Sequence, residues 1–241
     1  MNNQNYYPEG ASSGRYIYEQ DAIVMERSLI QRVFLWMTMG LSITGLTALL
    51  TYNSSFFYDV MSNNILFWGL MLAELGIVFY LSSRVMKMSF MTATALFGVY
   101  SVLNGITLSF IFAVYTMQSI STTFFVTAGT FAAMAAIGYT TKRDLSKMGS
   151  ILLMALIGLI IATVVNLFLK NSMFELVISG IGVLIFTGLT AYDTQKIKLM
   201  LRQAEDGEVA KKLSVIGALT LYLDFINLFL YLLRFLGSRN E

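Results

Sequence analysis

The chain has 241 residues, of which 56% are hydrophobic and only 12% are charged, and its formal net charge at pH 7 is +2. A soluble domain carries roughly 25% charged residues, so this composition excludes an ordinary soluble protein and indicates an integral membrane protein. The chain contains no cysteine and no histidine, which excludes disulfides, thiolate or histidine-ligated metal sites and Ser–His or Cys–His catalysis. The sequence contains no run of basic residues that would indicate nucleic-acid binding.

The first 25 residues are polar and have neither an apolar core nor a cleavage-site pattern, so we expect a flexible cytoplasmic tail. Residues 26–241 are then expected to form one transmembrane domain that is entirely α-helical. Seven apolar stretches reach the length of about 20 residues that a helix needs to cross a bilayer. The predicted spans are approximately 33–52, 65–83, 91–115, 119–140, 150–169, 174–195 and 213–236.

The distribution of lysine and arginine predicts the orientation of these spans. Basic residues are concentrated in cytoplasmic loops of membrane proteins, and thirteen of the 16 basic residues here lie before the first span or in the second, fourth and sixth connections. The remaining three are Lys170, Arg234 and Arg239. Seven spans therefore place the amino terminus in the cytoplasm and the carboxyl terminus outside.

The last span contains a line of polar residues that recur every three or four positions, which places them on one helical face. A carboxylate in the middle of a bilayer costs several kcal/mol unless it is paired, hydrated or protonated. The line either forms a hydrogen-bonded seam with another helix or faces an ion or proton path, and the carboxylate favours the path. Its members are Thr220, Asp224, Asn227, Tyr231 and Arg234.

A second aspartate, Asp193, lies at the end of the sixth span. Alone, it is typical of a membrane interface, but no helix-breaking residue occurs before Gly207, so we expect this helix to continue towards Arg202. That continuation would bring Asp193 towards the depth of Asp224. If the two carboxyl groups touch, their protonation is coupled, and the pair can act as a pH switch.

Two charged residues of the second span are further candidates. Glu74, in mid-span, either is protonated and inert or lines the same path. Arg84, at the cytoplasmic end, either reaches the aspartate pair or extends to the membrane surface. Arg234 is similarly an interfacial anchor or an outer gate, and Asn104 is expected to join two helices by hydrogen bonds.

Four stretches of the chain resemble the bacterial branch of the Bax inhibitor family, the transmembrane Bax-inhibitor-motif proteins. Similarity is strongest in LTLYLDFINLFLYLLRFLG (219–237) and TGLTAYDTQKIK (187–198). It extends to ERSLIQRVF (26–34) and IGYTTKRDLS (137–146). The resemblance implies that the seventh helix is wrapped by the other six and that the protein is a pH-sensitive Ca²⁺ leak of the bacterial inner membrane.

The resemblance also implies roles for individual residues. Asp193 and Asp224 correspond to the two-aspartate latch that senses pH, Glu74 to an acidic residue on the cation route, and Arg234 to the basic residue that closes the last span. The latch arginine of the family would fall, counted without gaps from Glu74, on Val85, one residue beyond Arg84. One residue turns a helix by about 100°, so Arg84 replaces it only if the helix tightens locally.

Three functional hypotheses follow. The preferred hypothesis is a proton-gated leak that contributes to Ca²⁺ homeostasis, with protons as the regulator. Ca²⁺ would be held only transiently, at Asp193, Asp224 and Glu74. No cofactor and no tightly bound metal are expected. The alternative is a membrane interaction protein that regulates another membrane machine, such as a protease, without conducting ions. A proton-coupled cation exchanger is a variant of the first. An intramembrane aspartyl protease is disfavoured because the only proline, Pro8, excludes the Pro-Ala-Leu element of such enzymes, so we expect no enzymatic activity.

Overall fold

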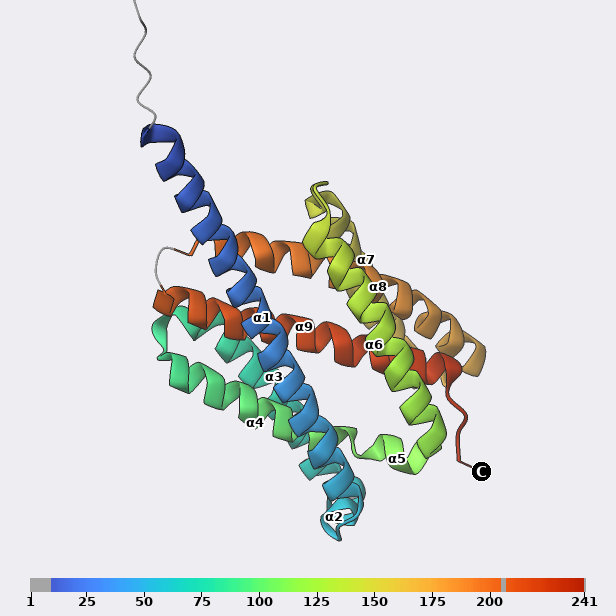
Figure 1. Ribbon diagram of the computed structural model, residues 1–241. Coiled ribbons are helices and arrows are strands. Elements are labelled where there is room, and N and C mark those ends of the chain that lie inside the picture. Colours follow the sequence, from blue (N-terminus) through green and yellow to red (C-terminus); the bar gives the residue numbers. More distant parts are fainter. Residues whose placement is uncertain (1–9, 205–206, 241) are drawn as a thin grey trace, which may run out of the picture.

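The computed structural model describes residues 10–204 and 207–240, and these are almost entirely helical (Figure 1). Seven helices are long and apolar enough to cross a membrane, as the sequence predicts. The helical elements are α1 (Gly10–Tyr52), α2 (Phe56–Ser62), α3 (Asn64–Arg84), the 3₁₀ turn η1 (Val85–Lys87), α4 (Phe90–Leu108), α5 (Phe110–Val114), α6 (Met117–Thr140), α7 (Ser146–Leu169), α8 (Ser172–Arg202) and α9 (Gly207–Leu236).

The helices are longer than the predicted spans at several ends. Helix α1 begins at Gly10, so residues 10–25 of the expected flexible tail are helical, whereas residues 1–9 of that tail lie outside the described residues. Helix α8 continues past Asp193 to Arg202, which confirms the predicted extension. The third span is divided at Ser109, whose hydroxyl donates to the carbonyl of Ile106 at 2.6 Å, so a serine rather than a proline marks the break between α4 and α5.

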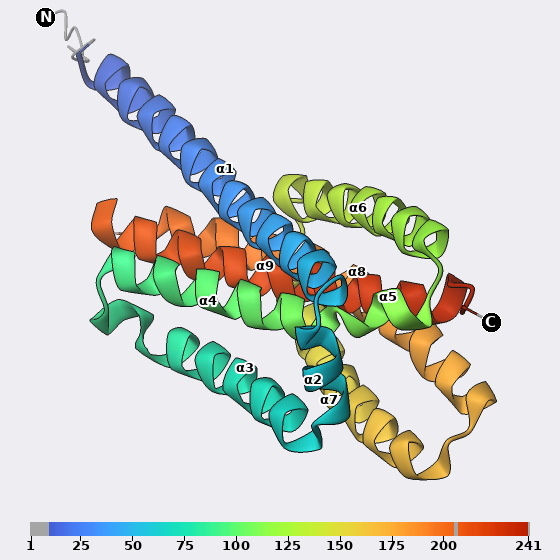
Figure 2. The same ribbon diagram turned by 90° about the horizontal axis from the view of Figure 1, so that it is seen from below.

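Helix α9 is the most buried of the seven spans. It packs extensively against α8, α1, α6 and α4, whereas α3 packs mainly on α4 and α7 mainly on α8 (Figures 1 and 2). In its most apolar window, 61% of the residues of α9 are buried, compared with 6% in α3 and in α7. Helices α3 and α7 therefore present most of their apolar surface to lipid. A position of α9 at the centre of all six other spans, and the side of the membrane on which the termini lie, stay predictions.

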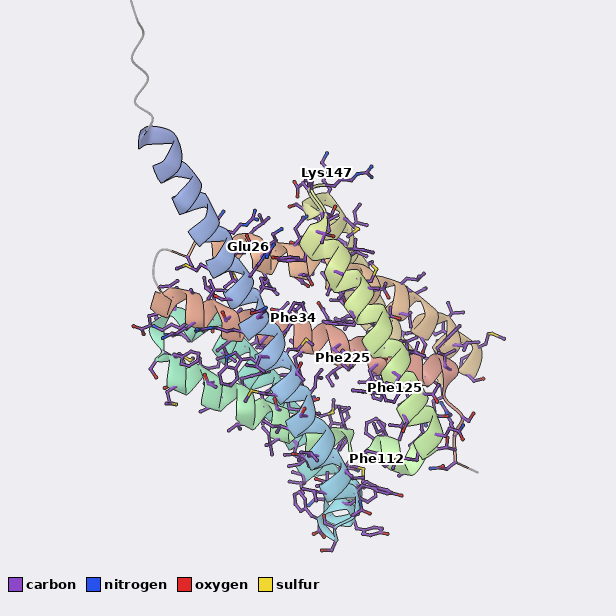
Figure 3. The ribbon with its side chains drawn as sticks, viewed as in Figure 1. Glu26, Phe34, Phe112, Phe125, Lys147 and Phe225 are labelled. Carbon is purple, nitrogen blue, oxygen red and sulfur yellow. The ribbon has the colours of Figure 1, made fainter. Side chains whose placement is uncertain are left out.

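The aromatic contacts of α9 show how its apolar face is filled. Phe225 lies between α1 and α6, near Phe34 in Figure 3. Its ring lies 5.5 Å from that of Phe131 and 5.7 Å from that of Phe124, in edge-on geometry. An apolar cavity of about 480 Å³, lined in part by Phe34 and Phe225, remains between these helices. Edge-on aromatic pairs add to the stabilisation from burial alone, so this face is held by packing rather than by polar groups.

Close approach between α6 and α8 depends on a glycine. A Cβ atom at Gly138 would lie 2.1 Å from the carbonyl oxygen of Ala191, which is far inside van der Waals contact. Small residues allow helices to approach in membranes, where lipid removes the usual hydrophobic driving force between them. Gly138 therefore sets the distance between α6 and the part of α8 that precedes Asp193.

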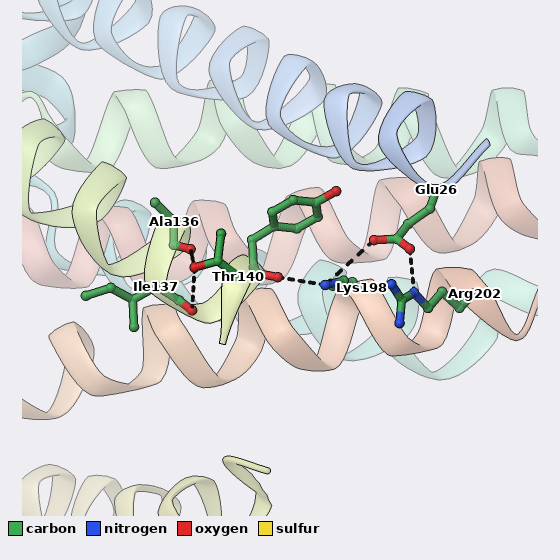
Figure 4. A network of polar contacts seen from close by, with 7 residues as sticks. Glu26, Ala136, Ile137, Thr140, Lys198 and Arg202 are labelled. Carbon is green, nitrogen blue, oxygen red and sulfur yellow. Dashed lines mark hydrogen bonds and ion pairs between the residues drawn. The ribbon is translucent and has the colours of Figure 1, made fainter. Parts of the chain in front are cut away.

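A cluster of charged residues joins α1, α6 and α8 at one end of the bundle (Figure 4). The carboxylate of Glu26 is only 6% exposed, accepts a hydrogen bond from Nε of Arg202 and lies 3.9 Å from Nζ of Lys198. Lys198 also donates to the carbonyl of Tyr139 at 2.7 Å and lies 4.5 Å from the centre of its ring. A buried carboxylate is stable only when it is paired and hydrogen-bonded, and these two cations supply both conditions.

We expect Gly138→Ala to lower the thermal stability of the protein, because the added methyl group forces the backbones of α6 and α8 apart. Overpacking of this kind typically costs about 1–3 kcal/mol. The matched control is Gly129→Ala on the same helix, where a Cβ atom would meet nothing within 4 Å. Thermal unfolding in lipid nanodiscs measures both variants, and equal melting temperatures for the two would contradict the close contact.

Replacing Glu26 by alanine should also destabilise the fold, since Lys198 and Arg202 then lose their carboxylate. We expect a loss of about 1–3 kcal/mol, the range for leaving a buried polar partner unsatisfied. The control is Glu208→Ala, which removes a partner of Lys212 from a pair whose glutamate is 68% exposed, and exposed pairs contribute little. The same unfolding measurement compares the two; an effect of Glu208→Ala as large as that of Glu26→Ala would argue against a special role for the buried cluster.

Candidate functional site

The two aspartates predicted to form a pair face each other between α8 and α9, which are the two helices in most extensive contact. The side chains of Asp193 and Asp224 lie within hydrogen-bonding reach of each other. Asp224 is only 5% exposed, and its Oδ2 atom is buried without a hydrogen-bond partner. An ionised carboxylate can only accept hydrogen bonds, so a hydrogen bond between the two groups requires one proton on the pair.

One cation, Lys196 of α8, lies near the aspartate pair. Lys196 interacts electrostatically with Asp193, and its Nζ atom lies 5.8 Å from the centre of the Tyr192 ring. Lys196 is exposed and Asp193 is half-buried, whereas Asp224 is only 5% exposed. Asp193 is therefore the more accessible member of the pair.

Arg84 does not join the aspartate pair. Its side chain is exposed and forms no ion pair with a carboxylate among residues 25–204 and 207–240. The helix tightens into the 3₁₀ turn η1 only after Arg84, and Val85 at the start of this turn is 5% exposed, in a segment that packs against α9. The inward-facing residue is therefore Val85, which is the position that the latch arginine of the family would occupy when residues are counted without gaps from Glu74. Arg84 lies one residue earlier, on the exposed face.

The other members of the polar line lie along the same helix but are engaged locally. Thr220 donates to the carbonyl of Ile216 at 3.1 Å, and Asn227 donates to the carbonyl of Leu223 at 2.8 Å, both within α9. These two side chains thus form no hydrogen-bonded seam with another described helix.

Near the far end of the line, Tyr231 stacks on Phe186 of α8 with ring centres 5.7 Å apart. Gly182 of α8 leaves the room for that ring, because a Cβ atom there would lie 2.5 Å from it. Arg234 lies 5.3 Å from the centre of the Tyr231 ring. Tyr231 and Arg234 therefore lie where the carboxyl-terminal part of α9 packs against the amino-terminal part of α8.

Glu74 belongs to a second polar cluster, which the structure does not bring to the aspartates. Its Oε2 atom accepts from Asn104 Nδ2 at 3.0 Å, and its Oε1 atom accepts from Thr107 Oγ1 at 2.7 Å. Tyr222 of α9 donates to Asn104 Oδ1 at 3.0 Å, so Asn104 of α4 joins α3 to α9. The prediction that Asn104 joins helices is confirmed.

Sequence reasoning missed Tyr222 and Thr44 in this cluster. The hydroxyl groups of Tyr222 and Thr44 are 2.6 Å apart, and Thr44 also lies 2.9 Å from the carbonyl of Ser101. Tyr222 gives its one proton to Asn104, while the one proton of Thr44 has two acceptors within reach, the carbonyl of Ser101 and the hydroxyl oxygen of Tyr222. Hydrogen bonds therefore run in one direction from Tyr222 through Asn104 to the carboxylate of Glu74, which fits a Glu74 side chain that only accepts.

The two clusters lie on opposite faces of α9. Tyr222 and Asp224 are two residues apart, and two residues rotate a helix by about 200°. Asp224 therefore points to α8 while Tyr222 points to α4 and α1. For Tyr222, the available sequence signal was a tyrosine hydroxyl inside an apolar span, where such a group usually needs a partner.

No group of three or more acidic residues gathers within the described part of the chain at a spacing suited to a metal ion. A cation at the aspartate pair would therefore have two protein carboxylates as ligands. Ca²⁺ takes six to eight oxygen ligands, so most of them would have to be water or carbonyl oxygens.

Comparison with known proteins identifies the relatives of the chain. A family profile described as "Inhibitor of apoptosis-promoting Bax1" matches residues 26–241. The inner membrane protein YbhL of Escherichia coli K12 is 48% identical over 226 residues, covering 91% of this chain and 97% of that protein. An uncharacterized protein of Borreliella burgdorferi is 48% identical over 225 residues, covering 92% and 97%, and one of Rickettsia prowazekii is 46% identical over 215 residues, covering 89% and 91%. A profile match over almost the whole chain, together with relatives that are 48% identical over nearly their full length, shows that the chain belongs to the Bax inhibitor family.

Proposed function

We propose that this protein is a pH-sensitive Ca²⁺ leak channel of the bacterial inner membrane, in which Asp193 and Asp224 form the latch. The contact between these two side chains, one half-buried and one buried, carries the proposal. The inner membrane is the location given in the name of the Escherichia coli relative. The distribution of basic residues supports a cytoplasmic amino terminus, which puts the latch towards the cytoplasmic end of the bundle.

Protonation of the pair supplies the gating step. A pair that shares one proton has a charge-assisted hydrogen bond, which is roughly twice as strong as a neutral one. A second proton makes the bond neutral and weakens the link between α8 and α9, so the leak opens as pH falls. A Ca²⁺ ion that passes then displaces protons at the same oxygen atoms, and the unpartnered Oδ2 atom of Asp224 is free to accept it.

The hydrogen bonds on the opposite face of α9 supply a restoring contact. Separation of Asp224 from Asp193 moves α9, and that movement also strains the bonds of Tyr222 to Asn104 and Thr44. Glu74 lies at the end of this chain of bonds. In this proposal Glu74 meets the cation only after α9 has moved, whereas Thr220, Asn227, Tyr231 and Arg234 flank the route on the α8 side.

Two alternatives make different demands on the same residues. A protein that only regulates another membrane machine keeps its function when both aspartates are neutralised, and the exposed apolar faces of α3 and α7 are the surfaces it offers to such a partner. A proton-coupled exchanger moves Ca²⁺ against its gradient when a proton gradient is applied. A leak moves Ca²⁺ only down its gradient.

Purified protein in vesicles that contain a Ca²⁺-sensitive dye should release Ca²⁺ faster at acidic than at neutral pH. The difference between a charged and a neutral hydrogen bond is about 1–1.5 kcal/mol, which corresponds to a change of about tenfold in rate. Asp224→Asn and Asp193→Asn should each flatten the pH dependence, because neither variant retains two carboxyl groups that share a proton.

The control for this experiment is Asp144→Asn. Asp144 is exposed in the loop between α6 and α7, and its Oδ1 atom accepts from the backbone of Ser146 at 2.9 Å, which asparagine can also do. A flux that does not depend on pH in the unmodified protein, or that keeps its pH dependence in Asp224→Asn, would sink the proposed latch. Absence of flux from the unmodified protein would favour the regulatory alternative.

Tyr222→Phe should raise Ca²⁺ release at neutral pH while leaving the pH dependence in place, because it removes the restoring contact and keeps both aspartates. We expect an increase of about fivefold, corresponding to a hydrogen bond of about 1 kcal/mol. Tyr100→Phe is the matched control, since Tyr100 is also buried, at 4% exposed against 0% for Tyr222, and its hydroxyl makes no hydrogen bond to another described residue. Equal release from the two variants would remove Tyr222 from the mechanism.

A further inference from the structure

A basic cavity lies at the end of the bundle where α7 and α9 end and α8 begins. Its volume is about 560 Å³. Three of its lining residues are cations and one is an anion: Lys170, Arg234, Arg239 and Glu175. The geometry points to a binding site for the phosphate group of an anionic phospholipid. This inference is independent of ion permeation.

Two of the three cations in the cavity are not neutralised by the protein. Arg239 forms an ion pair with Glu175 at 3.3 Å. Arg234 is half-buried beside the ring of Tyr231, and neither Arg234 nor Lys170 has an acidic partner among the described residues. Two positive charges therefore remain for an external anion, and arginine and lysine together are the usual ligands of phosphate groups.

The backbone conformation holds Lys170 in place. Lys170 adopts the left-handed conformation, with φ of 50° and ψ of 38°, which is uncommon for a residue with a side chain. It does so at the tight connection between α7 and α8, where Asn171 caps the next helix by accepting from the backbone of Phe174 at 3.0 Å.

The segment that contains Arg239 is fixed as well. Arg239 pairs with Tyr115 in an isolated antiparallel bridge. Thr116 donates to the carbonyl of Ser238 at 3.1 Å, and Asn240 donates to the carbonyl of Val114 at 2.9 Å. These bonds attach the segment to the connection between α5 and α6 on both sides of Arg239. Its side chain is thus directed back to α8 from a fixed position, as a preorganised site requires.

The surroundings favour a lipid over a free phosphate ion. Leu167 of α7 lines the cavity and is 62% exposed, and its neighbours Phe168 and Leu169 are 83% and 63% exposed. Helix α7 is one of the two spans that present most of their surface outward. A phospholipid with its phosphate in the cavity would therefore lay its acyl chains along apolar side chains that need covering. Basic pockets between membrane helices commonly bind lipid headgroups in this way.

Native mass spectrometry of the full chain in a neutral detergent, titrated with phosphatidylglycerol or with phosphatidylcholine of the same acyl chains, tests the assignment. We expect tighter binding of phosphatidylglycerol. Each basic residue near a membrane surface contributes about 1 kcal/mol, so Lys170→Asn and Arg239→Gln should each weaken binding about fivefold and the double variant about twenty-five-fold. Asparagine tolerates the left-handed conformation, so the first variant removes the charge and keeps the backbone.

Two controls separate charge from structure. Lys170→Arg keeps the charge and should bind as the unmodified protein does, while Lys87→Gln removes an exposed basic residue in η1, away from the cavity. Inorganic phosphate serves as the soluble competitor. Displacement of phosphatidylglycerol by millimolar phosphate would overturn the lipid assignment in favour of a free anion. Equal binding of the two lipids, or no loss in the double variant, would overturn the site itself.

Discussion

A carboxylate in the middle of a membrane helix needs a partner, and the packing of α8 against α9 follows from that need. Asp224 is 5% exposed inside the bundle, and the ionisable group that it meets among the described residues is Asp193. An unpaired charge at such a depth costs several kcal/mol. Helix α8 continues past Asp193 to Arg202, and Gly182 lets the ring of Tyr231 lie close to α8 elsewhere in the same helix–helix contact. In the proposed function, this contact between the two helices is also the one that responds to protons.

Helix α9 carries two polar contacts that differ in chemistry. On one face Asp224 meets another carboxyl group, and the state of that contact depends on how many protons the pair holds. On the other face Tyr222 meets neutral amide and hydroxyl groups that do not titrate near neutral pH. In the proposed function, one face responds to pH while the other keeps α9 in register with α1 and α4. A single helix placed between a variable and a constant contact is suited to small, reversible displacements.

The sequence predicted those features that depend on a single helix. Hydropathy located all seven spans, the absence of a breaker predicted the extension of α8, and the spacing of polar residues placed Asp224 and Arg234 on one face. Features that depend on the rotation of one helix relative to another were not accessible. The bonds from Tyr222 to Asn104 and Thr44 join three helices whose relative phases no local pattern specifies. The same limit applies to Glu26, which lies in a polar segment by sequence but is 6% exposed in the fold. Arg84 is a residue for which the sequence suggested an inward position that the fold does not give it. It lies one residue before the inward-facing Val85, and one residue turns the side chain to another face of the helix.

Helix α1 is attached to the two halves of the latch at separate points along its length. Glu26 fixes it to Lys198 and Arg202 beyond Asp193 on α8, while Thr44 fixes it to Tyr222 on α9. Eighteen residues of helix separate these attachments, a length of about 27 Å at 1.5 Å per residue. In the proposed gating, a rigid helix joined in this way to α8 and α9 would act as a lever. A tilt of only a few degrees would displace one attachment by an ångström or more relative to the other, so the first helix, which contains neither aspartate of the pair, would transmit the opening of their contact from one end of the bundle to the other.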